Sequence, residues 1–262
     1  MDQKLINLVN EIADLISNKV LEENQNNFYK FGTNIGLGAD GTVTKYIDKF
    51  AEDIALDKIK KSKRKVNVLS EEAGFIDKKA KYTLVLDPVD GTRNCYRGIP
   101  FYSVSIAIGK KSISDVEYGI VKNIPTGDVF TAEKGHGAYL NKKQFVVPDV
   151  PDKEILTSLA LGKNHDKVTM KLAKKDKVRS LGSASLEMCM VGIGGLDYFV
   201  VGKEYMRVVD IAASTLILRE AGGIVTNISG KELEMPFNLE ERSSVVAACT
   251  RELIDMVILK LN

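Results

Sequence analysis

Two aspartates, Asp87 and Asp90, stand three residues apart at the end of an apolar run and are well placed for chemistry. Pro88 lies between them, and Gly91-Thr92 follows directly. Carboxylates supply oxygen ligands to a divalent cation, and a helix that begins at Gly91 would present its first amides to an anion. Together these features outline a phosphate site. A lone Asp-x-x-Asp is more often a turn with a cap, so the motif needs further carboxylates to support it.

Glu71 and Asp87 each follow a stretch with the pattern of a buried strand, residues 66–70 and 82–86. Consecutive strands tend to be neighbours in a sheet, and their ends then meet at one edge. We therefore expect Glu71 to lie close to Asp87 and Asp90.

Asp48 and Asp210 are each expected in the first turn of a helix. Thr44 is expected to cap the first of these helices, and Asp210 stands at or near the start of a long apolar helix, residues 208–221. For Asp48, an ordinary first-turn acid favoured by the helix dipole is locally the better interpretation. For Asp210, an N-cap is an equally good one.

An oxygen-only ligand set indicates Mg²⁺ or Mn²⁺, which keep water ligands and bind together with substrate phosphates. His136 and His165 are distant from these acids, and the sequence has no His/Cys spacing typical of zinc. The sequence also lacks a Gly-x-Ser-x-Gly elbow and a P-loop. Thr92 could hydrogen-bond an attacking water. The residues alone therefore indicate Mg²⁺-dependent phosphate-ester chemistry, without identifying the ester.

The elements that must position these acids follow from periodicity. A helix is expected over residues 5–23, then a glycine-rich loop or hairpin over 32–38, and a second helix that includes Phe50 and Ile59. Alternating segments predict an antiparallel meander, and Pro148 and Pro151 suggest a boundary between two halves. Strands are expected over 101–108, 117–121, 128–132, 156–161, 196–201, 224–226 and 244–248. Helices are expected over 166–175, 185–193 and 252–261, and the segment 177–184 lies between two of them, where strand and helix alternate.

Composition sets the class of protein. The 262 residues are 44% hydrophobic and 27% charged, with a net charge of +2, so the chain can bury a core and has no bias towards nucleic acid or membrane surfaces. Three scattered cysteines make no disulfide framework. The basic run 58–65 is expected to be a solvated helix end. No signal peptide or spanning segment is evident, so we expect a cytoplasmic protein.

Three segments resemble the signatures of the inositol monophosphatase superfamily, in the family's order and at its spacing. They are Ser70-Glu71-Glu72-Ala73-Gly74, Leu86-Asp87-Pro88-Val89-Asp90-Gly91-Thr92-Arg93-Asn94, and Val208-Val209-Asp210-Ile211-Ala212-Ala213 with the later Glu220-Ala221-Gly222-Gly223. The segment 39–48 is similar to the mobile-loop region of archaeal members, which act on both fructose 1,6-bisphosphate and inositol monophosphates.

The resemblance implies an α/β sandwich with layers α-β-α-β-α, the sugar-phosphatase fold of this superfamily. With the boundary suggested by Pro148, we expect two halves: residues 1–147 with the mobile loop and metal motifs, and residues 148–262 with substrate-pocket residues and the last metal ligand. The resemblance further implies a homodimer, a lithium-sensitive phosphatase of carbohydrate metabolism (gluconeogenesis), and two to three Mg²⁺ per site, with Mn²⁺ as a substitute.

Residue by residue, the resemblance implies a first metal held by Glu71, Asp87 and the Val89 carbonyl. Asp87, Asp90 and Asp210 would bind a second metal. Glu71 and Thr92 would orient the nucleophilic water, and the amides of Gly91 and Thr92 would hold the phosphate. Asp48, with the loop 30–40, would help to bind a third metal that serves catalysis.

Two departures from inositol-specific members bear on the substrate. Val209 stands where they typically carry Trp, and Lys203 stands where they carry a glutamate that binds inositol hydroxyls. A lysine suits a second phosphate better than a polyol, although a solvated surface lysine is an equally good interpretation. Arg179 could add charge to the same pocket and Ala184 could line it; Arg207 is a weaker candidate.

Fructose 1,6-bisphosphate is therefore the expected main substrate, with inositol 1-phosphate also hydrolysed. The alternatives are a phosphatase for 3′-phosphoadenosine nucleotides or NADP, and a non-catalytic homologue that binds metals or partners. The intact set of acids argues against the non-catalytic homologue.

Overall fold

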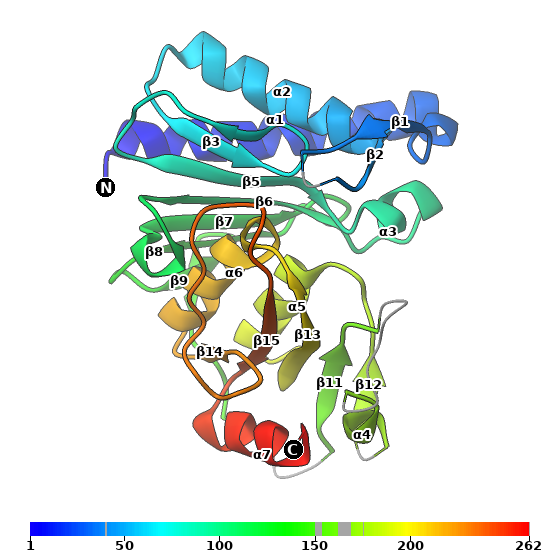
Figure 1. The fold of residues 1–262 in the computed structure, drawn as a ribbon, viewed down its shortest axis with the longest axis vertical. Helices are drawn as coiled ribbons and strands as arrows, with labels where there is room; N and C mark the ends of the chain where they lie inside the picture. Colours follow the sequence, from blue (N-terminus) through cyan, green and yellow to red (C-terminus); the bar gives the residue numbers. More distant parts are fainter. Residues whose placement is uncertain (40, 150–153, 162–168, 175, 262) are drawn as a thin grey trace.

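The computed structural model describes residues 1–39, 41–149, 154–161, 169–174 and 176–261, which form five stacked layers (Figure 1). Helices α1 (Gln3–Asn27) and α2 (Tyr46–Ser62) cover one face of an eight-stranded sheet. Helices α5 (Ala184–Gly192) and α6 (Val208–Glu220) lie between that sheet and a five-stranded sheet. Helices α4 (Thr169–Ala173) and α7 (Arg251–Leu261) form the last layer. The expected α-β-α-β-α order is confirmed.

The eight-stranded sheet contains the predicted antiparallel meander. Strands β5 (Thr83–Asp90), β6 (Ser103–Gly109), β7 (Tyr118–Asn123) and β8 (Val129–Glu133) pair in succession. Strand β3 (Asn67–Ser70) pairs parallel to β5, with Ser70 opposite Leu86. The expectation that both strands end at the same edge is therefore confirmed. The sheet's outer strands are β4 (Gly74–Ile76), β9 (Ala138–Leu140) and β10 (Lys143–Phe145), which are too short for periodicity to reveal.

Strand β5 runs further than the predicted 82–86. It continues through Pro88 to Asp90, and all eight of its residues are buried. The pairing with β6 shifts register between Asp87 and Asp90, where a proline that lacks an N–H group is tolerated. Both carboxylates thus project from the strand itself rather than from a turn beyond it.

The five-stranded sheet has the order β12-β11-β13-β15-β14. Strand β13 (Tyr198–Met206) extends five residues beyond the predicted end at Val201, because its outer part pairs again with β15 at Met206. The predicted helix 166–175 is seen only as α4, which ends before a turn at Lys174. Residues 166–168 and 175, and also His165, lie outside the described residues. The other strands are β11 (Leu156–Leu159), β12 (Lys177–Arg179), β14 (Ile224–Thr226) and β15 (Ser243–Ala248).

Helix α6 is buried on every side from Val208 to Leu218, because both sheets contact it. Its close approach to β7 depends on Gly119: a Cβ at this position would lie 2.9 Å from the carbonyl oxygen of Ala213. One hydrophobic core includes β5 and β8 together with α5, α6 and the second sheet. The two halves therefore share a core, and the boundary at residues 147–148 stays a prediction.

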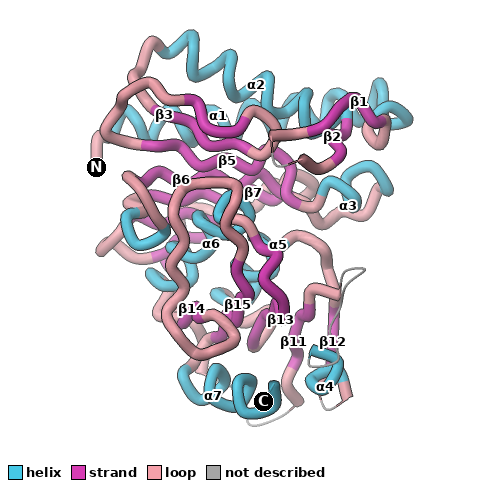
Figure 2. Tube along the Cα trace, viewed as in Figure 1, coloured by secondary structure: helices cyan, strands magenta, loops and turns pink. Residues whose placement is uncertain are grey.

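The glycine-rich segment forms a hairpin of β1 (Asn34–Leu37) and β2 (Val43–Lys45), beside α3 (Thr92–Arg97) (Figure 2). The prediction that Thr44 caps α2 is wrong. Lys45 is the N-cap, and its amide donates a hydrogen bond to the Asp48 carboxylate. The Thr44 hydroxyl donates to the Glu72 carboxylate instead. The basic run does end α2, at Ser62. Two short 3-10 turns, Phe28–Lys30 and Ile113–Asp115, complete the elements. No helix in the described ranges is long and apolar enough to cross a membrane.

Candidate active site

Four carboxylates from three elements gather at one end of the eight-stranded sheet. Glu71 follows β3, Asp87 and Asp90 lie in β5, and Asp210 lies in the first turn of α6. The pKa of Asp87 is raised well above its ordinary value by burial, and then by the charges of Asp90, Glu71 and Asp210. Such mutual repulsion requires the groups to be close together. The structure thus brings together the acids that the sequence singled out.

Asp90 is oriented by two serines from the opposite half of the chain. Its Oδ2 accepts a hydrogen bond from the Ser183 hydroxyl at 2.6 Å and from the Ser185 amide at 2.8 Å. Burial raises its pKa to about 6, although the serine hydrogen bonds oppose that shift because they stabilise the ionised form. Asp90 is therefore held in one orientation by the start of α5.

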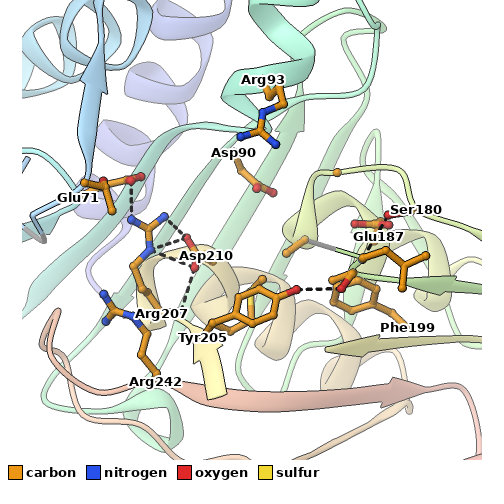
Figure 3. A pocket seen from close by; sticks show the side chains of 16 residues that line it. Glu71, Asp90, Arg93, Ser180, Glu187, Phe199, Tyr205, Arg207, Asp210 and Arg242 are labelled. Atoms are coloured by element: carbon orange, nitrogen blue, oxygen red, sulfur yellow. Dashed lines mark hydrogen bonds and ion pairs between the residues drawn. The ribbon is translucent and has the colours of Figure 1, made fainter. Parts of the chain in front are cut away.

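Asp210 is the third residue of α6 rather than its N-cap, which is Arg207. The Arg207 amide donates to Asp210 Oδ2 at 2.9 Å, and Nη2 donates to Oδ1 at 2.7 Å. The same guanidinium forms an ion pair with Glu71 through Nη1. Arg207 therefore lies between two of the candidate metal ligands, as Figure 3 shows. The sequence suggested it only as a weak substrate-binding candidate.

Thr92, the first residue of α3, contacts Asp48 on α2. Its hydroxyl lies 2.8 Å from Asp48 Oδ1 and 3.1 Å from the Val89 carbonyl oxygen. Burial raises the pKa of Asp48 to about 7; the hydrogen bond from Thr92 lowers it, and Glu71 and Glu72 raise it further. Asp48 thus interacts electrostatically with the other acids of the site, and it also accepts a hydrogen bond from the N-cap amide of α2.

Gly91 joins β5 to α3 with a backbone conformation that side chains rarely adopt, φ +91°. A Cβ at this position would lie 3.1 Å from the Gly182 carbonyl oxygen and 3.2 Å from that of Phe101. The neighbouring Asn94 amide donates to the carbonyl oxygens of Phe101 and Leu181. The turn that follows the aspartates is therefore packed tightly against the loop before α5.

A cavity of about 570 Å³ opens beside the carboxylates. Ala184 lines it, as expected, whereas Arg179 and Lys203 do not: both are exposed, and Arg179 donates to the Val178 carbonyl oxygen. Other residues that line the cavity were not identified from the sequence as site residues. They include Arg93, Ser180, Glu187, Tyr205 and Arg242.

Only one of these missed residues had a usable sequence signal. Arg93 directly follows Thr92 inside the recognised motif, whereas Arg242 and Tyr205 lie in segments without a motif. Glu187 is 2% exposed, and burial raises its pKa to about 7 despite hydrogen bonds from the Ser158 hydroxyl and the Leu181 amide. In the sequence it reads as an ordinary first-turn acid.

The chemistry of these donors fits a hard divalent cation. All four acids offer oxygen, and the unbalanced negative charge that raises the pKa of Asp87 would be relieved by such an ion. Within the described ranges, no three or more His, Cys, Asp or Glu side chains are already arranged around a point where an ion would sit. The candidate ligands are thus close together, but their oxygens do not yet surround a single position for a metal ion.

Comparisons with known proteins agree with this geometry. The model of the inositol monophosphatase family matches residues 1–261. A fructose-1,6-bisphosphatase/inositol-1-monophosphatase of Methanothermobacter thermautotrophicus is 38% identical over 245 residues, which cover 88% of each chain. A bifunctional NADP phosphatase/NAD kinase of Methanococcus maripaludis is also 38% identical, over 84% of this chain but only 43% of that longer protein.

Solved structures give the same answer at the level of the fold. A crystal structure described as an inositol monophosphatase-fructose 1,6-bisphosphatase superposes with a TM-score of 0.85 at 34% identity and covers 98% of both chains. The family match along nearly the whole sequence agrees with the layered architecture and with the clustered carboxylates. This chain therefore belongs to the inositol monophosphatase family.

Proposed function

We propose that this protein is a Mg²⁺-dependent phosphomonoesterase that acts on phosphorylated sugars. The observation that carries the proposal is the gathering of Glu71, Asp90 and Asp210, from three different elements, on the wall of one cavity. Asp87 is 3% exposed, and its pKa is raised by burial and by the charges of these three acids. Arginines reach the same cavity, so it offers both cation ligands and partners for a substrate anion.

The metal ligands follow from this arrangement. Glu71, Asp87 and the Val89 carbonyl would hold one ion, and Asp87, Asp90 and Asp210 a second. When bound, such ions activate water and stabilise the leaving oxygen of an in-line displacement. A third, weaker position beside Asp48 and the loop 30–40, and replacement of Mg²⁺ by Mn²⁺, are also part of the proposal.

The protein's own groups would orient the attacking water and the phosphate. Because the Thr92 hydroxyl donates its one proton to Asp48 or to the Val89 carbonyl, its lone pairs stay available to a water. Glu71 would accept a hydrogen bond from the same water. The amides of Gly91 and Thr92, at the start of α3, would hold phosphate oxygens.

For the substrate, we propose fructose 1,6-bisphosphate first and inositol 1-phosphate second. The name of the 38% identical archaeal relative, with both activities, supports this order of candidates. Arg93 and Arg242, which reach the cavity from opposite sides in Figure 3, would serve a second phosphate. Lys203 and Arg179, the residues expected from the sequence, would have to move to reach the cavity.

NADP is the second candidate substrate, because the name of another 38% identical relative includes that activity. The match covers less than half of that longer protein, so this support is weaker. A homodimer and a cytoplasmic location stay predictions.

A substrate panel would test the proposal. We would measure kcat/KM with Mg²⁺ for fructose 1,6-bisphosphate, inositol 1-phosphate, 3′-phosphoadenosine phosphate and NADP, in the wild type and in Lys203→Glu and Arg242→Glu. We expect Arg242→Glu to lower the ratio of bisphosphate to monophosphate turnover at least about tenfold, because one lost charge-assisted contact is worth about 1.5–3 kcal/mol. We expect Lys203→Glu to change that ratio less.

Two results would contradict the proposal. NADP turnover above that of both sugar phosphates would favour the second candidate. No Mg²⁺-dependent phosphate release from any of the four would leave the non-catalytic homologue as the better interpretation.

A further inference from the structure

Three N–H groups of one residue, Arg207, donate to the Asp210 carboxylate. Its Oδ1 receives hydrogen bonds from Arg207 Nη2 at 2.7 Å and Nε at 3.2 Å, and its Oδ2 from the Arg207 amide at 2.9 Å and Nε at 3.2 Å. A carboxylate offers about four lone-pair positions. Arg207 therefore occupies most of the positions through which Asp210 would bind a cation.

Arg207 also joins two elements that supply candidate metal ligands. Its Nη1 forms an ion pair with Glu71 after β3, while Nη2 and Nε bond Asp210 on α6. The side chain of Arg207 is 16% exposed, so this contact is largely shielded from solvent. Burial disfavours the charge on Arg207, but Asp210 and Glu71 more than compensate and raise its pKa.

A guanidinium and a divalent cation at these same oxygens would repel each other. Both carry positive charge, and at a few ångströms in a partly buried site their repulsion is screened only weakly. The described acids are also not arranged around a ready-made ion position. The cavity that Arg207 lines gives its side chain room to move once it leaves the carboxylates.

We propose that Arg207 is an internal counter-cation that holds Glu71 and Asp210 in the metal-free protein and must be displaced when a metal ion binds Asp210. Arg207 thus sets the metal affinity as a positioning residue, and it does so by competition. The inference rests on the metal-binding part of the proposed function.

The test is a titration of metal-stripped protein with Mg²⁺ and Mn²⁺ by isothermal calorimetry, in the absence of any substrate. We expect Arg207→Gln to bind at least about tenfold more tightly than the wild type, because no cation then has to leave. Arg207→Lys keeps the charge but cannot reproduce the planar contact of the guanidinium with both carboxylate oxygens, so it should also bind more tightly, though by less. Arg242→Gln is the matched control, since Arg242 lines the same cavity but donates to backbone carbonyls.

A second measurement separates competition from a general structural role. The melting temperature of Arg207→Gln in EDTA should fall below that of the wild type, while its rise on addition of Mg²⁺ should be larger. Equal or weaker metal binding by Arg207→Gln and Arg207→Lys would overturn the proposal. Absence of metal binding by the wild type would instead contradict the proposed function.

Discussion

The hydroxyl of Thr92 lies 2.8 Å from the carboxylate of Asp48, and this contact connects α3 to α2 across 44 residues of sequence. Asp48 uses its other oxygen to accept from the Lys45 amide at 3.3 Å. One side chain thus fixes the start of α2 and the orientation of a hydroxyl at the start of α3. The turn after β5 and the helix after the hairpin are positioned relative to one another by this pair.

Replacement of Thr92 by alanine should therefore impair catalysis rather than folding. We expect kcat for phosphate release to fall about 10²-fold or more, the scale of a misplaced reacting group. The stability should fall by only about 1 kcal/mol, for the one hydrogen bond lost. Thr126→Ala is the control, because Thr126 bonds Asp128 in an exposed turn. Near-normal turnover in Thr92→Ala would contradict the proposed mechanism.

Asp90→Asn should abolish most Mg²⁺-dependent turnover while the fold is retained. The amide oxygen can still accept from Ser183 and Ser185, so the local hydrogen bonds survive, but the charge that would bind a cation is lost. Ser183→Ala should have a smaller effect, about 1 kcal/mol on kcat/KM, because Asp90 keeps its bond from the Ser185 amide. Phosphate release and circular dichroism would check both variants, and equal activity of Asp90→Asn and wild type would be incompatible with the metal site.

Gly91→Ala should destabilise the protein more than Gly127→Ala does. Both glycines have positive φ, +91° and +78°, so each substitution costs about 1–2 kcal/mol of backbone strain. Nothing lies within 4 Å of a Cβ at Gly127, whereas one at Gly91 meets the carbonyl oxygens of Gly182 and Phe101. Urea denaturation would measure the free energy of unfolding of both variants. Because the backbone strain is similar, the difference between the two losses reports the steric crowding at Gly91. Equal losses in the two variants would show that the turn tolerates a methyl group.

The metal-free protein should lose stability as the pH rises from about 4 to 7. Burial raises the pKa of Glu187 and Asp48 to about 7, above the ordinary values of 4.5 and 3.8. The folded state then binds more protons than the unfolded state between these values, so the free energy of unfolding falls as pH rises. Thermal unfolding in EDTA across this pH range would measure this loss of stability.

Glu187→Gln isolates the contribution of one group. Glutamine keeps an oxygen that accepts from Ser158 and Leu181 but does not ionise. We expect a shallower decline with pH and, at pH 8, a stability on the order of 2–3 kcal/mol above the wild type. A melting temperature that rises with pH in both proteins would refute the assignment of raised pKa values.

The sequence predicted the parts of the fold that depend on long periodic segments. Helices α1, α2, α6 and α7 and the meander from β5 to β8 occur where periodicity indicated them, with ends that differ by a few residues. Strands of three residues, such as β4 and β9, carry too few positions for a period to register. The end of β5 was misplaced because Pro88 usually marks a turn, whereas here it lies at a register shift.

The acids of the site were predictable because they stand in motifs at the ends of elements, and the structure brings them together. The charges around the cavity were not predictable. Lys203 was chosen because it stands where inositol-specific members carry a glutamate, but it is exposed on the outer part of β13. Arg242 reaches the cavity from a segment far along the chain and without a motif, so only the packing of the second sheet reveals it.

The contact between Gly119 and Ala213 has a consequence for how this sequence can vary. Gly119 touches none of the acids, yet a methyl group there would push α6 away from β7 and carry Asp210 with it. The absence of a side chain at Gly119, in the middle of the sheet, thus keeps the candidate metal ligand Asp210 in place on the neighbouring helix α6. A screen for tolerated substitutions should find Gly119 as intolerant as the acids themselves, for a reason of size rather than charge.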